Sequence, residues 1–451
     1  MPPRESYKKY FKNKKITMLG LGLLGRGVNV AKFLAGLGAE LTITDLKSAE
    51  ALEPSIKQLK KFPKICYVFG EHRLEDFRNR DMVIKAAGVS LDSPFIAEAM
   101  KHNIPIEMDA SLFAKFSPAT IIGVTGTRGK TTVTNLLVHI LETAFPGHVF
   151  IGGNIRGMAT LPLLKKAKAG DYVVLELDSW QLQGFGDAKL SPHIAVFTNF
   201  LHDHMNYYKG NMEQYFADKA NIFMYQKEGD LLVASEEATK EIRKHTQGLR
   251  SKLITAHKKI VPQSWKIKIP GEHNRVNIAC ALEVTEAIGI PERITKRAVE
   301  SFPGVPGRLE YLCSVRGVKY WNDTTATTPD GNRVAIQTLA EKGKKNLVLI
   351  AGGNDKNLEF EDMAKLINHT VKALVLIQGT ATEKILTLLP KKLKYPMIVV
   401  GSMREAVAHA DGFAERGDTV LLSPGAASFG IFKNEYDRGD QFTALVKKLK
   451  Q

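Results

Sequence analysis

The residues with the clearest chemical meaning form a glycine-rich stretch, GTRGKTT, at positions 126–132. It follows an apolar run at 121–124 and precedes a helix-like segment, Val133 to Ile140. A strand, a glycine turn and a helix N-terminus form a polyphosphate site, because backbone N–H groups point at the anion, a lysine reaches the terminal phosphates and a threonine hydroxyl holds Mg²⁺. Val124 stands where the strict P-loop pattern has its first glycine, so the motif is a variant. The stretch predicts a phosphate site rather than only a tight turn.

Three polar side chains farther along the chain could complete this site. Glu176 lies near the end of an apolar strand-like run, where a carboxylate can hold Mg²⁺ directly or through water, although a strand-end glutamate can also be incidental. His204 follows another strand and could bind a metal or hydrogen-bond a loop. Lys219 shares a helical face with Tyr215 and Phe223, and a lysine on such a helix usually extends its charge to the surface. The residue pattern alone leaves these alternatives open.

A second glycine-rich loop, near the N-terminus, has the spacing of a dinucleotide-binding fold. A strand-like run at 16–19 leads into GLGLLG at 20–25, and a helix-like segment follows. The next strand-like run ends at Asp45, about 20 residues after Gly25, where such folds place an acid for a ribose hydroxyl. A further unit has a strand at 81–84 and a loop at 85–88. The segment predicts a site for a nucleotide diphosphate, which need not be NAD.

The length of 451 residues suggests roughly three domains. The two glycine-rich loops belong to residues 1–108 and 109–304, and a Pro- and Gly-rich break at 301–307 precedes the last segment, 305–451. Strands are expected at 172–177, 194–198, 318–321, 346–350, 373–377, 397–400 and 419–422, and helices at 212–225 and 329–339. This alternation predicts an α/β protein with a parallel sheet in the last segment, and the loops after its strands should carry the chemistry.

The composition indicates a globular protein of a reducing compartment. Apolar residues make up 44% and charged residues 24% of the chain, and its three cysteines, Cys66, Cys280 and Cys313, match no metal-binding spacing. The lysine-rich N-terminus lacks the apolar stretch of a signal peptide, and no apolar run approaches the length of about 18 residues that a membrane span needs. We therefore expect a cytoplasmic protein without membrane insertion. The net charge of +16 comes in small groups without interleaved aromatic residues, which favours solvated faces over a nucleic-acid surface.

A series of short motifs, in order along nearly the whole chain, resembles the Mur ligases. The motifs are GTRGKTT, GGNIRG, LELDSWQL, HDHM, YFADKANIF, GEHNRVN, GVPGRLE, YWNDTTATTPD, AGGNDK and SPGAASFGIFKN. The resemblance implies three domains: an N-terminal Rossmann-like domain that binds a UDP substrate, a central P-loop ATPase domain with a parallel sheet, and a C-terminal Rossmann-like domain that binds an amino acid. It also implies that a monomer uses ATP to add D-glutamate to UDP-N-acetylmuramoyl-L-alanine, through an acyl phosphate, in peptidoglycan precursor synthesis.

The same resemblance implies roles for individual residues. Lys130 would grip the β- and γ-phosphates, and two Mg²⁺ ions would be held by Thr131, Glu176, His204 and Lys219. Lys219 matches a lysine that becomes carbamylated, a change that turns a cation into a carboxylate and requires a lowered pKa. Further ATP contacts would come from Gly126, Thr127, Gly129, Thr132, Asn154, Asn274, Asn277, Arg308 and Asp323. Contacts with the UDP substrate would come from Gly20, Gly22, Leu23, Gly25, Asp45, Lys47 and Gly88.

The acceptor pocket would belong to the last domain, where Thr327, Lys356 and Ser428 match positions that hold D-glutamate. Lys356 would pair with a carboxylate, and the two hydroxyls would donate hydrogen bonds. Three residues depart from the family pattern: Thr325 stands where many members have a lysine, Glu435 stands where many have an aromatic residue, and Leu24 stands where a threonine is common. These departures leave L-glutamate or another amino acid open as the acceptor.

Other classes of protein compete with this interpretation. Folylpolyglutamate synthases resemble the last two domains but lack the first, so residues 1–108 argue against them. A non-enzymatic nucleotide-binding or nucleic-acid-binding protein would give Glu176, His204 and Lys219 no reason to converge. An NAD-dependent oxidoreductase would not explain GTRGKTT.

Overall fold

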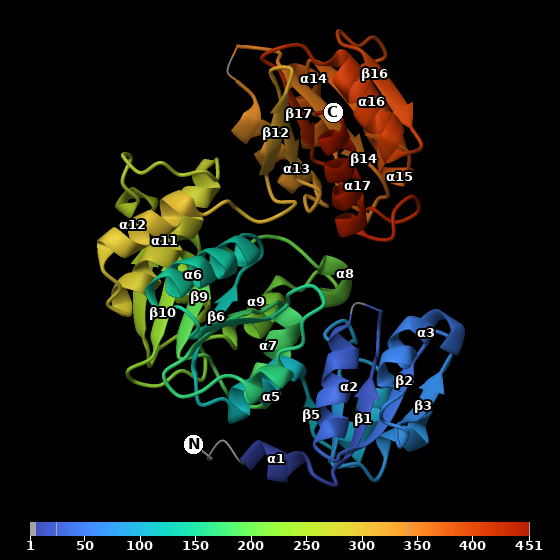
Figure 1. Ribbon diagram of the computed structural model, residues 1–451, viewed down its shortest axis with the longest axis vertical. Helices are drawn as coiled ribbons and strands as arrows, with labels where there is room; N and C mark the ends of the chain where they lie inside the picture. The colour runs from blue at the N-terminus through green and yellow to red at the C-terminus, as the bar shows by residue number, and fades with distance from the viewer. Residues whose placement is uncertain (1–5, 24, 342, 451) are drawn as a thin grey trace. The chain divides into compact units, whose positions relative to one another are not determined.

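The computed structural model describes residues 6–23, 25–341 and 343–450, which form three sheets with helices between the strands (Figure 1). They fall into two compact units. The first comprises residues up to Trp265 together with Arg275–Glu300, and the second comprises Lys266–Asn274 together with Ser301 onwards. The expected domain limits, 1–108, 109–304 and 305–451, stay predictions. Within the described ranges, no helix is both long enough and apolar enough to span a bilayer.

The first sheet has five parallel strands in the order β3-β2-β1-β4-β5. The strands are β1 (Lys15–Leu19), β2 (Glu40–Asp45), β3 (Cys66–Phe69), β4 (Met82–Lys85) and β5 (Ile106–Glu107). The accompanying helices are α1 (Ser6–Phe11), α2 (Arg26–Gly36), α3 (Ala49–Ile56), α4 (Pro94–Lys101) and α5 (Asp109–Phe116), with short turns η1 (Lys57–Leu59) and η2 (Leu74–Phe77). The strand order reverses between β1 and β4, and open parallel sheets bind ligands at such a point.

The second sheet, also in the first unit, has six parallel strands in the order β11-β10-β9-β6-β8-β7. The strands are β6 (Thr120–Thr125), β7 (Val149–Gly153), β8 (Tyr172–Glu176), β9 (Ile194–Phe197), β10 (Leu231–Ser235) and β11 (Lys252–Ala256). The helices and turns from β6 to the end of this part are α6 (Lys130–Ala144), η3 (Leu161–Lys165), α7 (Ser179–Asp187), α8 (Met205–Tyr208), α9 (Met212–Ala220), α10 (Glu236–His245), η4 (Lys258–Ile260), α11 (Glu272–Ala287) and α12 (Glu292–Ser301). Here the order reverses between β6 and β9, so the loop after β6 lies at the switch point.

The third sheet has six strands in the order β12-β13-β17-β14-β15-β16, and it is not purely parallel as expected. Its strands are β12 (Glu310–Val315), β13 (Val318–Asn322), β14 (Leu347–Gly352), β15 (Ala373–Ile377), β16 (Met397–Val400) and β17 (Thr419–Leu422). The edge strand β12 pairs antiparallel with β13 across a two-residue turn, Arg316-Gly317, in which both residues have positive φ. Such a turn matches the twist of a hairpin and makes the antiparallel edge possible.

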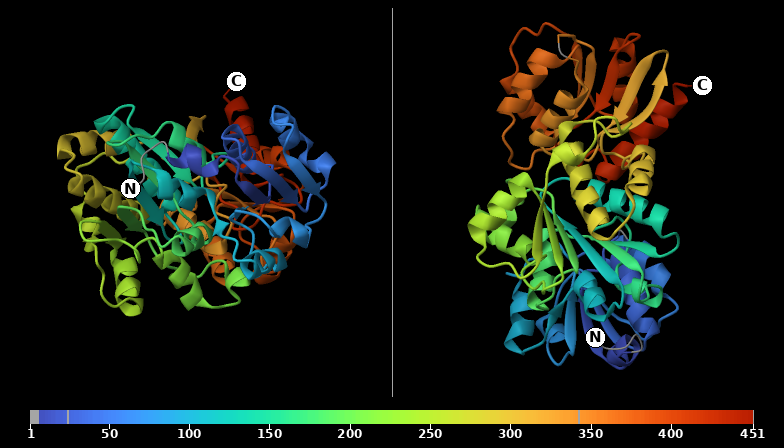
Figure 2. Two further views of the ribbon diagram at one scale, coloured as in Figure 1. Left: turned by 90° about the horizontal axis from the view of Figure 1, so that it is seen from below. Right: turned by 90° about the vertical axis from the view of Figure 1, so that its left-hand side faces the viewer.

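The central strands of the third sheet, β17, β14 and β15, have buried side chains on both faces. In β14, Leu347, Leu349 and Ala351 pack on one face, while Val348 and Ile350 pack on the other. The first face is covered by α13 (Pro329–Leu339), α14 (Glu361–Thr370) and α15 (Thr380–Leu388), and the second by α16 (Met403–Phe413) and α17 (Glu435–Lys448). The right-hand view of Figure 2 shows these helices on the two sides of the orange and red strands. A continuous apolar run is what a strand with two covered faces requires.

Candidate functional site

The GTRGKTT stretch forms the expected loop between β6 and α6. Gly129 precedes the first residue of α6 with a φ of 83°, and Gly126 leaves β6 with a φ of 141°. A Cβ atom at Gly126 would clash with Thr198, and a Cβ atom at Gly129 would clash with Asn277. Both positions need glycine, because the φ angles are positive and a neighbouring side chain leaves no room for a methyl group. The N–H groups at the start of α6 are those that face the anion in phosphate-binding loops.

Two lysine side chains converge on one carbonyl oxygen of this loop. Lys130 Nζ donates to the oxygen of Gly126 at 2.9 Å and to that of Thr127 at 3.1 Å. Lys219 Nζ reaches the same Gly126 oxygen at 2.9 Å from α9, and it lies 4.8 Å from the centre of the Tyr215 ring. The phosphate loop therefore has two amines beside it, one from its own helix and one from a helix much later in the chain.

Lys219 is not the surface lysine that its helical pattern allowed, since only 1% of the residue is exposed. Burial, together with the nearby charge of Lys130, lowers the pKa of Lys219 well below its ordinary value. Both causes disfavour the ammonium form, because it loses hydration and faces a like charge. A neutral amine is a nucleophile, so the environment prepares Lys219 for chemistry that an ordinary surface lysine does not perform.

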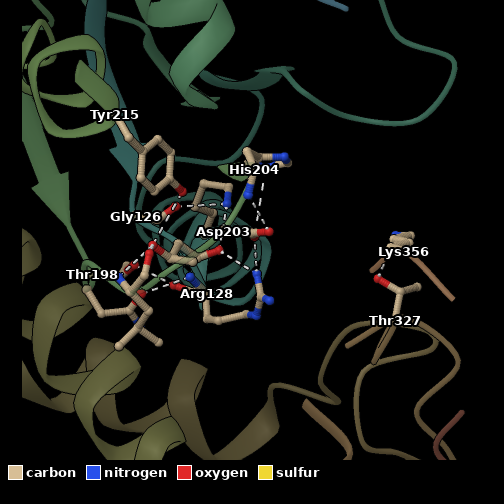
Figure 3. A network of polar contacts seen from close by, with 12 residues as sticks. Gly126, Arg128, Thr198, Asp203, His204, Tyr215, Thr327 and Lys356 are labelled. Atoms are coloured by element: carbon tan, nitrogen blue, oxygen red, sulfur yellow. Dashed lines mark hydrogen bonds and ion pairs between the residues drawn. The ribbon is translucent and has the colours of Figure 1, made fainter. Parts of the chain in front are cut away.

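His204 belongs to a second polar group at the mouth of the loop (Figure 3). Arg128 Nη1 lies 2.6 Å from Asp203 Oδ2, and the other oxygen of Asp203 accepts the backbone N–H of His204 at 2.9 Å. His204 has a φ of 56°, a conformation uncommon for a residue with a side chain. Burial lowers the pKa of His204, and the two lysines of the loop act in the same direction, while Asp203 opposes them. The imidazole is thus held towards its neutral form, which is the form that ligates a metal.

Glu176 and Asn154 lie at the same sheet edge as the phosphate loop. Glu176 is the last residue of β8 and stands opposite Val124 of β6 and Gly153 of β7. The backbone N–H of Asn154 donates to the carbonyl oxygen of Glu176 at 2.6 Å. Thr131 and Thr132 are half-buried in the first turn of α6. Among the residues described, no three His, Cys, Asp or Glu side chains form a metal-binding group.

The expected UDP residues gather around the loop after β1. Gly20, Gly22 and Gly25 have φ angles of 99°, 66° and 88°, so all three adopt the conformation that favours glycine. Asp45 Oδ2 accepts the N–H groups of Leu21 and Gly22, each at 3.0 Å. Its other oxygen accepts the N–H of Lys47 at 3.0 Å, and the exposed residues of the set are Leu23, Lys47 and Gly88. The carboxylate of Asp45 thus braces the loop itself, and its contact with a ribose stays a prediction.

The pKa of Asp45 reflects this bracing. Burial raises the cost of ionising the carboxyl group, but three backbone hydrogen bonds and the charge of Lys47 outweigh it and lower the pKa below its ordinary value. The side chain is therefore an anion at neutral pH, and an anion holding N–H groups of the loop fixes the loop's shape.

Lys85 does not belong to the loop at 85–88, because it is the last residue of β4. Its side chain is 3% exposed, and Nζ donates to the carbonyl oxygen of Val89 at 3.1 Å. Burial lowers the pKa of Lys85 to about 8, although Asp178, Asp187 and Asp218 oppose the shift. The strand extends one residue farther than expected because Lys85 pairs with Leu19 of β1.

Lys85 should make stability depend on pH in a defined direction. Its pKa falls from about 10.5 in the unfolded chain to about 8 in the folded chain, so the unfolded chain binds more protons between these values. The free energy of unfolding should therefore rise with pH in this window, by roughly 2 kcal/mol between pH 7 and pH 10 for this group. We expect the difference between the wild type and Lys85→Met, measured by urea unfolding, to move in favour of the wild type over that range. A difference that does not change with pH would contradict the shift.

The expected acceptor residues all belong to the second unit. Lys356 Nζ is 3.5 Å from the hydroxyl of Thr327 (Figure 3), and the loop that carries Lys356 is hydrogen-bonded through Asn354 to Ala427, the neighbour of Ser428. Lys356 is exposed, whereas Ser428 is buried. An amine beside a hydroxyl can recognise a carboxylate, and the part of Ser428 in such a pocket stays a prediction.

Of the three residues that depart from the family pattern, Leu24 lies outside the described residues, while Thr325 and Glu435 make hydrogen bonds within the second unit. The hydroxyl of Thr325 donates to the carbonyl oxygen of Gly307 at 2.9 Å, and Glu435 is the first residue of α17. The carbonyl oxygen of Glu435 accepts the hydroxyl of Thr324 at 2.7 Å. Burial lowers the pKa of the nearby Arg438 to about 10, and this guanidinium donates to the carbonyl oxygen of Thr324 at 2.8 Å.

Three expected ATP residues also lie in the second unit. Asp323 is buried and accepts the N–H of Leu309 at 3.0 Å and the hydroxyl of Ser423 at 2.9 Å. Burial raises its pKa to about 7, while these hydrogen bonds and Arg308 act against the shift. Asn274 donates from its side chain to the carbonyl oxygen of Pro270 at 2.7 Å. These contacts lie within the unit, and the roles of these residues towards ATP stay predictions.

Sequence reasoning assigned no role to two arginines beside the glycine-rich loops, Arg128 and Arg26. Arg128 pairs with Asp203, and Arg26 contacts the loop that carries Asn154. Each partner is distant in the chain, and a backbone carbonyl has no signature in the sequence. The only sequence feature that could have drawn attention to these arginines is their position, since each stands in or directly after a glycine-rich loop.

Comparisons with known proteins agree with this arrangement of sheets and loops. Residues 14–107 match the MurD-like N-terminal domain of Mur ligases, residues 124–258 the Mur ligase middle domain, and residues 307–425 the glutamate ligase domain of Mur ligases. A UDP-N-acetylmuramoylalanine--D-glutamate ligase of Roseiflexus sp. (strain RS-1) is 37% identical over 96% of this chain and 98% of its own length. A protein with the same name from Borreliella burgdorferi (strain ZS7) is 35% identical over 97% of this chain and 98% of its own length.

A solved structure shares the fold along nearly the whole chain. The UDP-N-acetylmuramate-alanine ligase MurC of Thermotoga maritima aligns with a TM-score of 0.62 at 22% identity, over 96% of this chain and 99% of that protein. At this identity the likeness concerns the fold alone. The matches to three consecutive family domains and the identity to full-length relatives show that the chain belongs to the Mur ligase family.

Proposed function

We propose that this chain is an ATP-dependent ligase that joins the carboxyl group of UDP-N-acetylmuramoyl-L-alanine to the amino group of D-glutamate in peptidoglycan precursor synthesis. The observation that carries the proposal is the buried Lys219 on the carbonyl oxygen of Gly126. An oxidoreductase or a passive nucleotide-binding protein has no use for a second, neutralised lysine at the phosphate loop. The names of relatives at 35–37% identity supply the two substrates.

The proposed reaction has two steps. A carboxylate is a poor electrophile, so the γ-phosphoryl group of ATP is first transferred to it, giving an acyl phosphate and ADP. The amine of D-glutamate then attacks the carbonyl carbon, a C–N bond forms, the bond to phosphate breaks, and the nitrogen loses a proton. Lys130 is placed to stabilise negative charge on the transferring group, because its amine is already fixed by the loop.

The residues beside the loop fit Mg²⁺, which prefers oxygen ligands. We assign Thr131 and Glu176 to this role, with His204 as a nitrogen ligand and Lys219 as a carbamate. The site would hold two ions, which when bound neutralise charge on the phosphates. The carbamate forms when the neutral Lys219 amine attacks CO₂, so that an N–C bond forms and a proton leaves to solvent. The depressed pKa of Lys219 supports this assignment, since only the neutral amine reacts.

The other proposed contacts follow from the likeness of this chain to the Mur ligases. Asn154 would approach the γ-phosphate, Asn274 and Asn277 the adenine, and Arg308 and Asp323 the nucleotide from the last domain. We place the domains at 1–108, 109–304 and 305–451, with the UDP moiety at the loop after β1. The proposed compartment is the cytoplasm, where ATP and nucleotide-linked sugars are made.

The test is phosphate release from ATP in the presence of Mg²⁺ and UDP-N-acetylmuramoyl-L-alanine, scanned over acceptors. D-glutamate should give the highest rate, and release should require both substrates. The scan should include L-glutamate, because Thr325 and Glu435 depart from the family pattern. Faster release with another amino acid would replace D-glutamate as the acceptor, and no release with any of them would reject the ligase.

The acceptor titration also tests Lys356. A charge-assisted hydrogen bond to a carboxylate contributes about 1.5–3 kcal/mol, so Lys356→Ala should raise the KM for D-glutamate roughly 10- to 100-fold. The KM values for ATP and the UDP substrate should change little. Thr325→Lys should lower the KM for D-glutamate by restoring a second cation.

The matched control is Lys365→Ala, which removes an exposed lysine from α14 of the same unit. It should leave all three KM values unchanged. An unchanged KM for D-glutamate in Lys356→Ala would place the acceptor pocket elsewhere.

A further inference from the structure

Arg26, the first residue of α2, joins the loop after β1 to the loop after β7 within the first unit. Its guanidinium donates from Nε to the carbonyl oxygen of Met158 at 3.1 Å. Nη2 lies 3.0 Å from the carbonyl oxygen of Gly153, 3.2 Å from that of Ile155 and 3.3 Å from Asn154 Oδ1. One side chain thus contacts four acceptors of a single short loop, residues 153–158.

The loop at 153–158 is shaped to present these acceptors. Gly153 and Gly157 have φ angles of 83° and 71°, which turn the backbone so that several carbonyl groups face the same side. A Cβ atom at Gly153 would clash with the backbone of Glu176, so the loop lies directly against the end of β8. Asn154 is held on both sides, by Arg26 at its side chain and by Glu176 at its backbone.

Helix α2 meets this loop at a second point, one turn farther on. Asn29 Nδ2 lies 3.5 Å from the carbonyl oxygen of Gly157. Gly25, which precedes Arg26, approaches the same loop, since a Cβ atom there would lie 3.6 Å from the Gly157 oxygen. The start of α2 is also the end of the GLGLLG loop. The loop assigned to UDP and the loop assigned to the γ-phosphate are therefore in direct contact.

We propose that Arg26 is a positioning residue that couples the two nucleotide sites. A diphosphate bound by the loop after β1 restrains the start of α2, Arg26 then holds the loop at 153–158, and Asn154 is fixed towards the phosphates of ATP. The identity of the two ligands rests on the proposed function. Arginine suits this task because its planar fork presents five N–H donors in a fixed geometry, which lysine cannot reproduce.

The coupling can be measured as the effect of one ligand on the affinity for the other. The probes are UDP and the non-hydrolysable β,γ-imido analogue of ATP, both with Mg²⁺ and the full chain, in calorimetric titrations. UDP should tighten binding of the analogue at least 5-fold in the wild type, and by linkage the analogue should tighten binding of UDP by the same factor. In Arg26→Gln this factor should fall below 2, while the affinity for each ligand alone changes less than 3-fold. Arg26→Lys should lie between the two.

Hydrogen exchange of the ligand-free chain gives a second readout. The N–H of Asn154, bonded to Glu176, should exchange at least 10-fold faster in Arg26→Gln than in the wild type. The control is Lys32→Gln, which removes a positive charge from the same helix. The hydrogen-bond partner of Lys32 is Gln58, which lies outside both loops. This control should match the wild type in both measurements.

In the binding measurements, the proposal is overturned by a wild type in which UDP leaves the affinity for the analogue unchanged, or by full coupling in Arg26→Gln. Unchanged exchange at Asn154 in Arg26→Gln would overturn it as well, because Arg26 would then not position the loop. Absence of phosphate release with every acceptor rejects the proposed function instead. The exchange measurement needs no ligand, so it still tests whether Arg26 holds the loop at 153–158.

Discussion

Replacing Lys130 with alanine should reduce ATP turnover at least about 100-fold and leave the chain folded. The amine of Lys130 is held by the carbonyl oxygens of Gly126 and Thr127, so its position is fixed before a nucleotide arrives. A preorganised donor acts on the charge that develops in the transition state, and the loss of one such donor typically costs about 10²–10³ in kcat. Little packing is lost, since Lys130 is only half-buried at the start of α6.

The measurement is phosphate release at saturating substrates, with thermal unfolding to verify the fold. Lys240→Ala is the matched control, because it removes an exposed lysine from α10 of the same unit. It should keep wild-type turnover. Near-normal turnover in Lys130→Ala would show that the GTRGKTT loop does not bind the transferring phosphate, even though the chain belongs to the Mur ligase family.

The sequence predicts best those elements that are short, strongly patterned runs between polar or turn-forming residues. β15, β16, β17 and α13 begin and end at the expected residues. β12 was missed: its pattern, EYLCSV, is only partly apolar, and its turn uses Arg316 and Gly317 instead of the Asn-Gly pair that marks a hairpin. An antiparallel edge strand therefore left no clear trace in the sequence.

Within the first unit, the site could be predicted where a motif is contiguous and could not where it depends on tertiary contacts. Glycine spacing alone placed the loops after β1 and β6. The burial of Lys219 did not follow from its helix, because the pattern fits equally well with a lysine that reaches the surface. The hydrogen-bond partner of the buried amine is the carbonyl oxygen of Gly126, 93 positions away in the chain. The contacts of Arg26 were unpredictable for the same reason, as most of its acceptors are backbone atoms.

The structure also bears on the competing protein classes. A purely NAD-binding chain would need only the first sheet, yet here the second sheet carries a glycine loop with two amines on one oxygen. A nucleic-acid-binding chain would place its lysines on an exposed face. Lys219 is instead buried, and its pKa is lowered by burial and by Lys130. An environment that disfavours the charge of a lysine is costly, and such costs concentrate where a reaction needs them.

The second large effect concerns Lys219, and its chemistry explains the expected result. Carbamylation requires the neutral amine, which burial and the charge of Lys130 favour. The product carries a negative charge beside Lys130, so the two groups attract each other, whereas an ammonium at Lys219 would be repelled. We therefore expect the carbamate to be the stable form of Lys219 in the presence of CO₂. It should be lost as the pH falls, because acid protonates the amine and releases CO₂.

Lys219→Ala should therefore lose turnover at least about 100-fold, and bicarbonate should not restore it, because the amine that captures CO₂ is gone. Acetate or formate should restore part of the rate, since a small carboxylate can occupy the space and return the negative charge.

Carbon-13 NMR after equilibration with labelled bicarbonate should give a carbamate signal in the wild type and in Lys240→Ala, and none in Lys219→Ala. If the wild type gives no such signal at neutral or alkaline pH while turnover still depends on Lys219, the residue acts as an amine and the carbamate is wrong. If Lys219→Ala keeps its turnover, the buried lysine has only a structural role. Its burial beside Gly126 would then no longer support the proposed function.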